Sequence, residues 1–242
     1  EARASEHTIR RTESILRALA TMSRELFAQV DWRSALISSF QALGVAAEAE
    51  GAFAVSFSVQ DGQPARVVDA CWLQNAPGQV NCAWVNSLLN QTHGWEPGLQ
   101  NREPVQVPGV CVHEIGDGLG SLTLLPVFLY GALWGALGFY TGGEPLVRSG
   151  PEIEALGTAA HVLAAAIERS DRSRIVGEAN AKLELALEGG GLATCVLHPE
   201  LKTMEFDERA SRVLGREAAE GYVSIDEFDS WIHPDEVFTY RL

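Results

Sequence analysis

The sequence predicts an α+β protein in which an antiparallel sheet flanked by helices is followed by a long linker helix and a partial α/β module. Three observations support this class. Apolar residues alternate with small ones from Gly51, and two apolar runs fill residues 121–140, as is typical of antiparallel strands. Residues with helical spacing lie on both sides of these strands. After Pro151 the next proline is Pro199, so one helix can run from residue 152 to about residue 188, on the order of 55 Å.

The first 30 residues have the spacing of a helix, because apolar or small residues recur three and four positions apart. Two interpretations remain open for it: a heptad seam that pairs with a second chain, or an amphipathic helix that packs on its own domain. We expect an N-terminal signalling helix over residues 1–30. Asp31 then predicts the N-cap of a second helix that ends between Gly44 and Gly51. The residues of the possible seam are Ile9, Thr12, Leu16, Leu19, Ser23, Leu26 and Val30.

The strands of the sheet are predicted between residues 51 and 140. Phe53 to Val59 alternates like a half-buried strand, and the turn signal Asp61-Gly62 leads into a returning strand. Residues 96–120 contain three prolines and five glycines, so we expect mostly loop there. The other expected elements are a strand over 66–73, a helix over 82–91, a strand over 105–112, and a hairpin of 121–129 with 133–140.

The long helix predicts how the chain is divided. Its polar run at residues 170–174 is unsuited to burial, so the helix is expected to leave one domain and enter another. We expect a domain over 31–170, a helical linker over 171–188 and a partial module over 189–242. A long helix without its own core commonly pairs with a parallel copy, which predicts a homodimer. The apolar positions that continue the three-four spacing are Ile153, Leu156, Ala160, Leu163 and Ile167.

The overall charge and the chain's ends exclude several classes of function. A formal net charge of −14 repels nucleic acids and anionic membranes, so neither is expected as a partner. The first residues lack the apolar core of a signal peptide and no stretch is long and apolar enough for a membrane span, which predicts a cytoplasmic protein or the cytoplasmic part of a larger one. Four cysteines, at positions 71, 82, 111 and 195, form no Cys-x-x-Cys pair and have no histidine at metal spacing. We therefore expect reduced thiols and no metal site.

The middle of the chain, about residues 14–172, resembles the GAF family. The resemblance lies in the order of elements and in the pattern SLTLLPVFLYGALWGALGFY at 121–140, followed by EIEALGTAAHVLAAAIER at 152–169. In that pattern Pro126 suits a strand edge or bulge, Gly131 a hairpin turn and Gly135 a close backbone approach. The resemblance implies a sensory domain that binds a small ligand or a partner.

The tail, residues 182–242, resembles the first half of a PAS domain. A helix breaks at Gly189-Gly190-Gly191, a hairpin follows over 192–206, and Ser224 with Glu227 forms a capping box before Trp231-Ile-His-Pro-Asp235. Tandem GAF and PAS modules are similar to the receivers of bacterial signalling proteins. The resemblance therefore implies a downstream output such as a histidine kinase or cyclase, and a fragment that is not itself an enzyme.

A ligand pocket, if one is present, is expected between one face of the sheet and residues 82–115. The alternative is that its aromatic residues are simply core. No cofactor is identified, and cyclic nucleotides are disfavoured because Arg66 and Arg102 are the only lysine or arginine residues between Gln41 and Pro145. His161 lacks the neighbours of a phosphoacceptor box and is expected to be structural. The candidate pocket residues are Trp72, Trp84, Leu88, His113 and Tyr140.

One enzymatic alternative comes from the free methionine sulfoxide reductase branch of the GAF family. Cys71, Cys82 and Cys111 are spaced roughly like the three redox cysteines of that branch. The glycine-rich context expected before the middle cysteine is, however, replaced by Pro77-Gly-Gln-Val-Asn. Buried, inert thiols are therefore the favoured interpretation.

Overall fold

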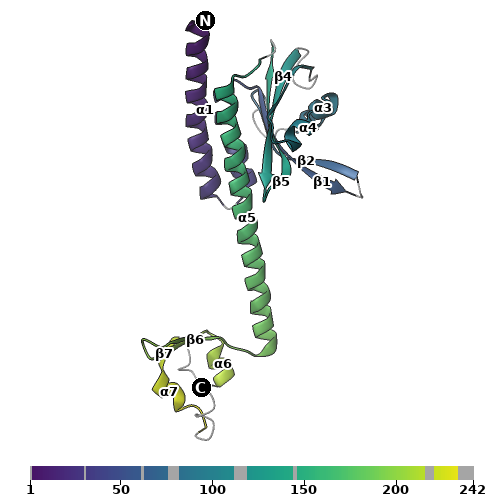
Figure 1. The fold of residues 1–242 in the computed structure, drawn as a ribbon. Helices are drawn as coiled ribbons and strands as arrows, with labels where there is room; N and C mark the ends of the chain where they lie inside the picture. Colours follow the sequence, from purple (N-terminus) through teal and green to yellow (C-terminus); the bar gives the residue numbers. More distant parts are fainter. Residues whose placement is uncertain are drawn as a thin grey trace. The chain divides into compact units, whose positions relative to one another are not determined.

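The protein forms two compact units, Glu1–Ser173 and Arg174–Leu242, in a computed structural model (Figure 1). No helix in the described part of the chain is long and apolar enough to cross a membrane. The structure describes residues 2–29, 31–60, 63–75, 82–111, 119–143, 146–215 and 221–233.

Unit 1 is built on a five-stranded antiparallel sheet with the strand order β2-β1-β5-β4-β3. The central β4–β5 hairpin confirms the predicted pairing, since Tyr130 (φ 50°) and Gly131 (φ 85°) make the tight turn between the two apolar runs. The Asp61-Gly62 turn lies outside the described residues. The strands are β1 Gly51–Gln60, β2 Gln63–Leu73, β3 Val105–Cys111, β4 Leu119–Leu129 and β5 Ala132–Gly142.

Three helices cover one face of this sheet: α1 Ala2–Ala28, α2 Trp32–Ala46 and the first part of α5 Gly150–Gly190 (Figure 1). The expected cap at the start of α2 is present, because the Asp31 carboxylate accepts hydrogen bonds from the backbone N–H groups of Arg33 and Ser34. The larger hydrophobic core lies between these helices and the sheet, and it includes Phe40, Leu125 and Phe139.

The packing of α1 decides between the two interpretations of its sequence. Ile15, Leu19, Met22 and Leu26 recur on one face and are buried in the core of unit 1. Leu19 and Leu26, which belong to the possible intermolecular seam, therefore pack in the core of their own domain. Leu16 of that seam remains exposed.

The long helix α5 confirms the predicted continuity, since it runs to Gly190 and ends where Gly191 adopts a positive φ of 62°. Its first half is not a free seam. Leu163, placed in the dimer seam by its spacing, has no exposed surface and packs in the core of unit 1, so that assignment was wrong. From Arg172 to Ala186 the helix is exposed throughout.

Two short helices, α3 Ala83–Gln91 and α4 Glu96–Gln100, cover the opposite face of the sheet (Figure 1). The helix α3 confirms the prediction for residues 82–91. The helix α4 replaces the expected loop: Pro97 occupies its first turn, where proline is tolerated, and Leu99 anchors it in a second core.

Unit 2 contains the end of α5 and a small sheet with the order β6-β7-β8. The capping box is present, since the Ser224 hydroxyl accepts a hydrogen bond from the backbone N–H of Glu227. A small core forms around Phe206, whose ring contacts those of Phe228 and Trp231. The elements are β6 Cys195–His198, β7 Thr203–Phe206, α6 Ala210–Leu214, β8 Gly221–Ser224 and α7 Ile225–Asp229.

Candidate functional site

The sheet of unit 1 separates two hydrophobic cores, and side-chain alternation assigns each strand residue to one of them. On β2, Cys71 belongs to the core beneath α3 and α4, whereas Trp72 packs against the core beneath α1, α2 and α5. A Cβ at Gly44 of α2 would collide with the Trp72 ring, so a glycine is needed there for the helix to approach the sheet. Trp72 is therefore not a pocket residue on the α3 face, which corrects the sequence-based assignment.

Three other candidate residues do lie together on the α3 face. Trp84, Leu88 and Tyr140 are all buried in the second core, with Trp84 packed edge-on against Phe53 at a centroid distance of 5.6 Å. Burial, followed by the negative charge of nearby Glu50, raises the pKa of Tyr140. His113, the fifth candidate, lies outside the described residues.

The Trp84 side chain carries an unused polar group. Its indole nitrogen is buried and has no hydrogen-bond partner among the described residues. A buried donor without an acceptor is costly, so the nitrogen marks a point where a small polar group would be stabilised. Trp84 thus combines a core role with one donor that has no acceptor among the described residues.

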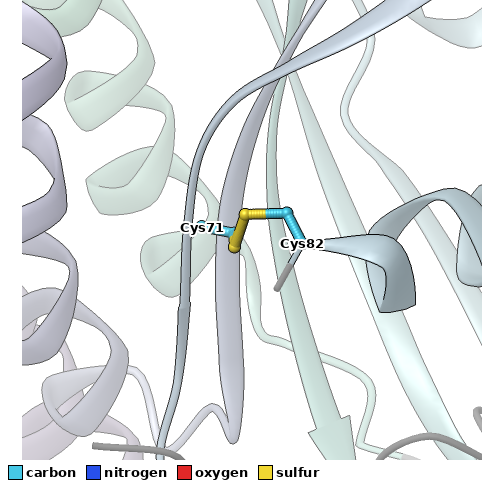
Figure 2. Close-up of a disulfide and its surroundings, with 2 residues drawn as sticks. All are labelled: Cys71 and Cys82. Carbon is cyan, nitrogen blue, oxygen red and sulfur yellow. A yellow bond between two sulfur atoms is a disulfide. The ribbon is translucent and has the colours of Figure 1, made fainter. Parts of the chain in front are cut away.

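Cys71 and Cys82 form a disulfide, contrary to the expectation of reduced thiols (Figure 2). Their Cα atoms are 5.9 Å apart, within the range that a disulfide can span. Cys82 is the N-cap residue of α3, so the bond links the start of that helix to β2. The spacing of the cysteines did not indicate the pairing, because the start of α3 is brought beside β2 only by the tertiary fold. Cys111 and Cys195 are free.

The α3 and α4 face also contains a hollow of about 460 Å³, which lies beside the β1–β2 hairpin. This volume falls within the usual range for small-molecule sites. None of the lining residues was predicted as a site from the sequence, although Arg66 is one of two cations between Gln41 and Pro145. The lining residues are Phe57, Ser58, Ala65, Arg66, Trp95, Glu96, Gln100 and Leu133.

The walls of the hollow are aromatic and its rim is polar. The Phe57 and Trp95 rings are 5.6 Å apart at an interplanar angle of 33°. Trp95 is oriented by a 3.1 Å hydrogen bond from its indole nitrogen to the carbonyl of Thr92. The Arg66 guanidinium lies 5.0 Å from the centre of the Trp95 ring, a distance suited to a cation–π contact. Such a site favours a flat apolar ligand with one polar or anionic group.

An ionic junction connects the sheet to the start of α5. Arg148 is buried and donates hydrogen bonds to the Ala47 carbonyl at 2.7 Å and to the Thr141 hydroxyl at 3.2 Å. Burial lowers the pKa of Arg148 to about 10, so it remains a cation at neutral pH. Glu152, in the first turn of α5, accepts a 2.8 Å hydrogen bond from Arg11. One cluster therefore joins β5, α1, α2 and α5.

The described part of the chain contains no group of three His, Cys, Asp or Glu residues placed to hold an ion.

The architecture of unit 1 is found in known structures at low sequence identity. The GAF domain of a protein described as a sensor histidine kinase from Pseudomonas syringae pv. tomato superposes with a TM-score of 0.51 at 15% identity, covering 73% of this chain and 99% of that one. The GAF domain of a phosphoenolpyruvate-protein phosphotransferase from Coxiella burnetii gives 0.50 at 18%, covering 68% and 98%. Unit 1 has a GAF-domain fold.

The GAF fold accounts for the order of elements in unit 1 and confirms the resemblance seen in residues 14–172. A free methionine-R-sulfoxide reductase from Neisseria meningitidis is also similar, with a TM-score of 0.44 and 16% identity over 67% of this chain and 93% of that one. At that level the likeness says nothing about chemistry. No family model and no curated protein matches the sequence.

Proposed function

We propose that this chain is the sensory and regulatory region of a bacterial signal-transduction protein, in which the GAF unit detects a small ligand. One observation carries the proposal: α5 is a single helix whose first half is buried in the core of the GAF unit and whose second half is exposed. A rigid helix anchored in a ligand-binding core transmits small changes in that core along its axis.

The ionic junction supports a route from the ligand face to the helix. Tyr140 lies in the α3-side core, and the next residue, Thr141, accepts the hydrogen bond from Arg148. Arg148 and Glu152 attract each other, and Glu152 belongs to the first turn of α5. A shift at the end of β5 would therefore change the polar contacts at the start of α5.

The exposed half of α5 supports a homodimer with a seam different from the one predicted at Leu163. Val176 and Leu183 are 58% and 56% exposed, and small alanines complete the three-four spacing between and beyond them. An exposed helical stripe of this kind gains stability by pairing with a second copy. The proposed seam residues are Val176, Ala179, Leu183 and Ala186.

We propose that the part of unit 2 that follows α5 is a PAS-like module that relays the signal to a kinase or cyclase elsewhere in the full-length protein. The β6–β7 hairpin and the Ser224-capped α7 support this assignment, because they occur in the order that the PAS resemblance implies. Nothing in the proposed relay requires a catalytic step in this chain.

The test is a ligand screen combined with hydrogen exchange on the whole chain. A panel of metabolites, including nucleotides, amino acids and neutral and acidic aromatic compounds, is examined by thermal shift, and each hit is then examined by exchange. We expect at least one hit to raise the Tm and to change exchange over residues 172–187. If no compound does both, the sensory proposal is wrong.

The dimer is tested by two matched substitutions in sedimentation experiments. Leu183→Glu should yield a folded monomer because it places a charge in the proposed seam. Leu163→Glu should instead destabilise the fold, because it buries that charge in the core of unit 1. A Leu183→Glu protein that remains dimeric would exclude this seam.

A second candidate function is free methionine sulfoxide reduction. The Cys71–Cys82 disulfide supports it, because a paired disulfide is the form that a thiol-dependent reductase leaves after oxidation. In this candidate, Cys111 supplies a third thiol. A coupled assay that supplies a dithiol reductant distinguishes the candidates: turnover that is lost in Cys111→Ser would establish the enzyme, and no turnover would leave the sensory role.

A further inference from the structure

We propose that the hollow beside Trp95 binds an aromatic monocarboxylate, with the ligand's ring against Phe57 and Leu133, next to the buried Trp95, and its carboxylate held by Arg66. This inference rests on the proposed function and gives its ligand a chemical class. Three features of the hollow lead to it: its aromatic wall, the weakly bonded guanidinium of Arg66, and the small number of other Lys and Arg residues in this part of the chain.

The aromatic wall selects for a flat ring. The Phe57 and Trp95 rings are tilted by 33° at a centroid distance of 5.6 Å, so they do not form a parallel stack. Leu133 adds an aliphatic side. Trp95 is only 2% exposed and its indole nitrogen is already bonded to the Thr92 carbonyl, so it fixes the hollow from within the core, and the partly exposed Phe57 and Leu133 supply the apolar surface that a ligand's ring would contact.

The guanidinium of Arg66 has unused capacity. Its two hydrogen bonds with described residues are long, at 3.4 Å to the amide oxygen of Asn90 and 3.5 Å to the carboxylate of Glu96. A guanidinium carries five N–H donors in a planar fork that matches a carboxylate. A ligand carboxylate could therefore make short paired bonds where Glu96 now makes one weak contact.

The charge of the surroundings limits the ligand to a single negative group. Arg66 and Arg102 are the only lysine or arginine residues from 42 to 144, and Arg102 instead lies over Phe128. The chain as a whole carries −14, which opposes anions from solution. One guanidinium can balance one carboxylate, whereas a phosphate would find no second cation.

The experiment measures the binding of four probes to the whole chain by isothermal titration: benzoate, indole-3-acetate, the neutral isostere benzamide, and inorganic phosphate. We expect one of the two carboxylates to bind, benzamide to bind at least about tenfold more weakly, and phosphate not to bind. A charge-assisted pair is typically strong enough for such a ratio.

Variants of the chain locate the site. Arg66→Met should weaken carboxylate binding at least about tenfold, whereas the matched variant Arg102→Met should not change it, although it also removes a cation from an aromatic ring. Glu96→Gln should strengthen binding several-fold, because it removes the carboxylate that competes for Arg66. A loss of fold would not produce that gain.

The outcomes separate this inference from the sensory proposal. Equal binding of benzoate and benzamide, or equal effects of Arg66→Met and Arg102→Met, would overturn the carboxylate assignment. If another compound class from the metabolite panel binds and changes α5 while both carboxylates fail, the sensory proposal stands and this inference is wrong. If no compound binds at all, both are wrong.

Discussion

Arg11 and Glu152 are 141 positions apart in the chain, and their side chains form an ion pair of 2.8 Å that joins α1 to the first turn of α5. The second carboxylate oxygen of Glu152 accepts hydrogen bonds from the backbone N–H and the hydroxyl of Ser149. Burial alone would raise the pKa of Glu152, but the hydrogen bonds from Ser149 and Arg11 outweigh it, so its pKa is lowered.

The lowered pKa predicts acid sensitivity. Because the folded pKa of Glu152 lies below its ordinary value of 4.5, the stabilisation is fully present above pH 4.5 and is lost as the pH falls through the folded value. In Glu152→Gln, the free energy of unfolding measured in urea should therefore fall less steeply below pH 4.5 than it does in the unchanged protein. The exposed neighbour Glu154 offers the control: Glu154→Gln should leave that pH dependence unchanged.

The Cys71–Cys82 disulfide should stabilise the α3 face. Its closed loop is short, so reduction or the double change Cys71→Ser/Cys82→Ser should lower the free energy of unfolding by about 2–3 kcal/mol. Hydrogen exchange should increase first in residues 83–91, whose helix the bond anchors. Cys195 is exposed and unpaired, and Cys195→Ser should change neither quantity. Unchanged exchange in α3 after reduction would contradict the anchoring role.

Two helical glycines should respond to alanine in opposite directions. At Gly44 an added Cβ would collide with the Trp72 ring, so Gly44→Ala should destabilise unit 1 by about 1–3 kcal/mol. At Gly157 on α5 an added Cβ meets no atom within 4 Å, so Gly157→Ala should stabilise by about 0.5–1 kcal/mol through helix propensity. Thermal unfolding of the two variants measures both signs.

Arg169 caps the end of α1 from a distant part of the chain. Its guanidinium donates to the carbonyls of Leu26, Phe27 and Gln29, all at 2.6–2.9 Å, which would otherwise lack helical partners. Arg169→Met should cost about 1–3 kcal/mol in urea unfolding. Arg172→Met removes an i,i+4 pair with Glu168 and a distant contact, at 6.0 Å, with the Tyr130 ring, and should cost less than about 1 kcal/mol. Equal costs would show that the capping contacts contribute nothing.

Local patterns predicted most elements of the fold. The β4–β5 hairpin, α3, the capped start of α2 and the continuity of α5 all follow from periodicity, turn residues and the spacing of prolines. The helix α4 was not predicted, because its five residues include proline and glycine and are held in place by Leu99 in a nonlocal core.

The candidate site was predicted only in part. Trp84, Leu88 and Tyr140 share the expected face, but periodicity could not tell which of the two faces Trp72 occupies, because both faces of this sheet are buried. The hollow escaped prediction for a related reason. Phe57, Arg66 and Trp95 become neighbours only when the β1–β2 hairpin meets α4.

The sequence by itself therefore determined the α+β class, the order of elements and the single long helix, because these depend on residues close together in the chain. The tertiary structure decided which helical faces are core, which cysteines pair and where the hollow lies. Leu163 illustrates the difference: its spacing suits a seam and a core equally, and only packing against the helices and sheet of unit 1 buries it.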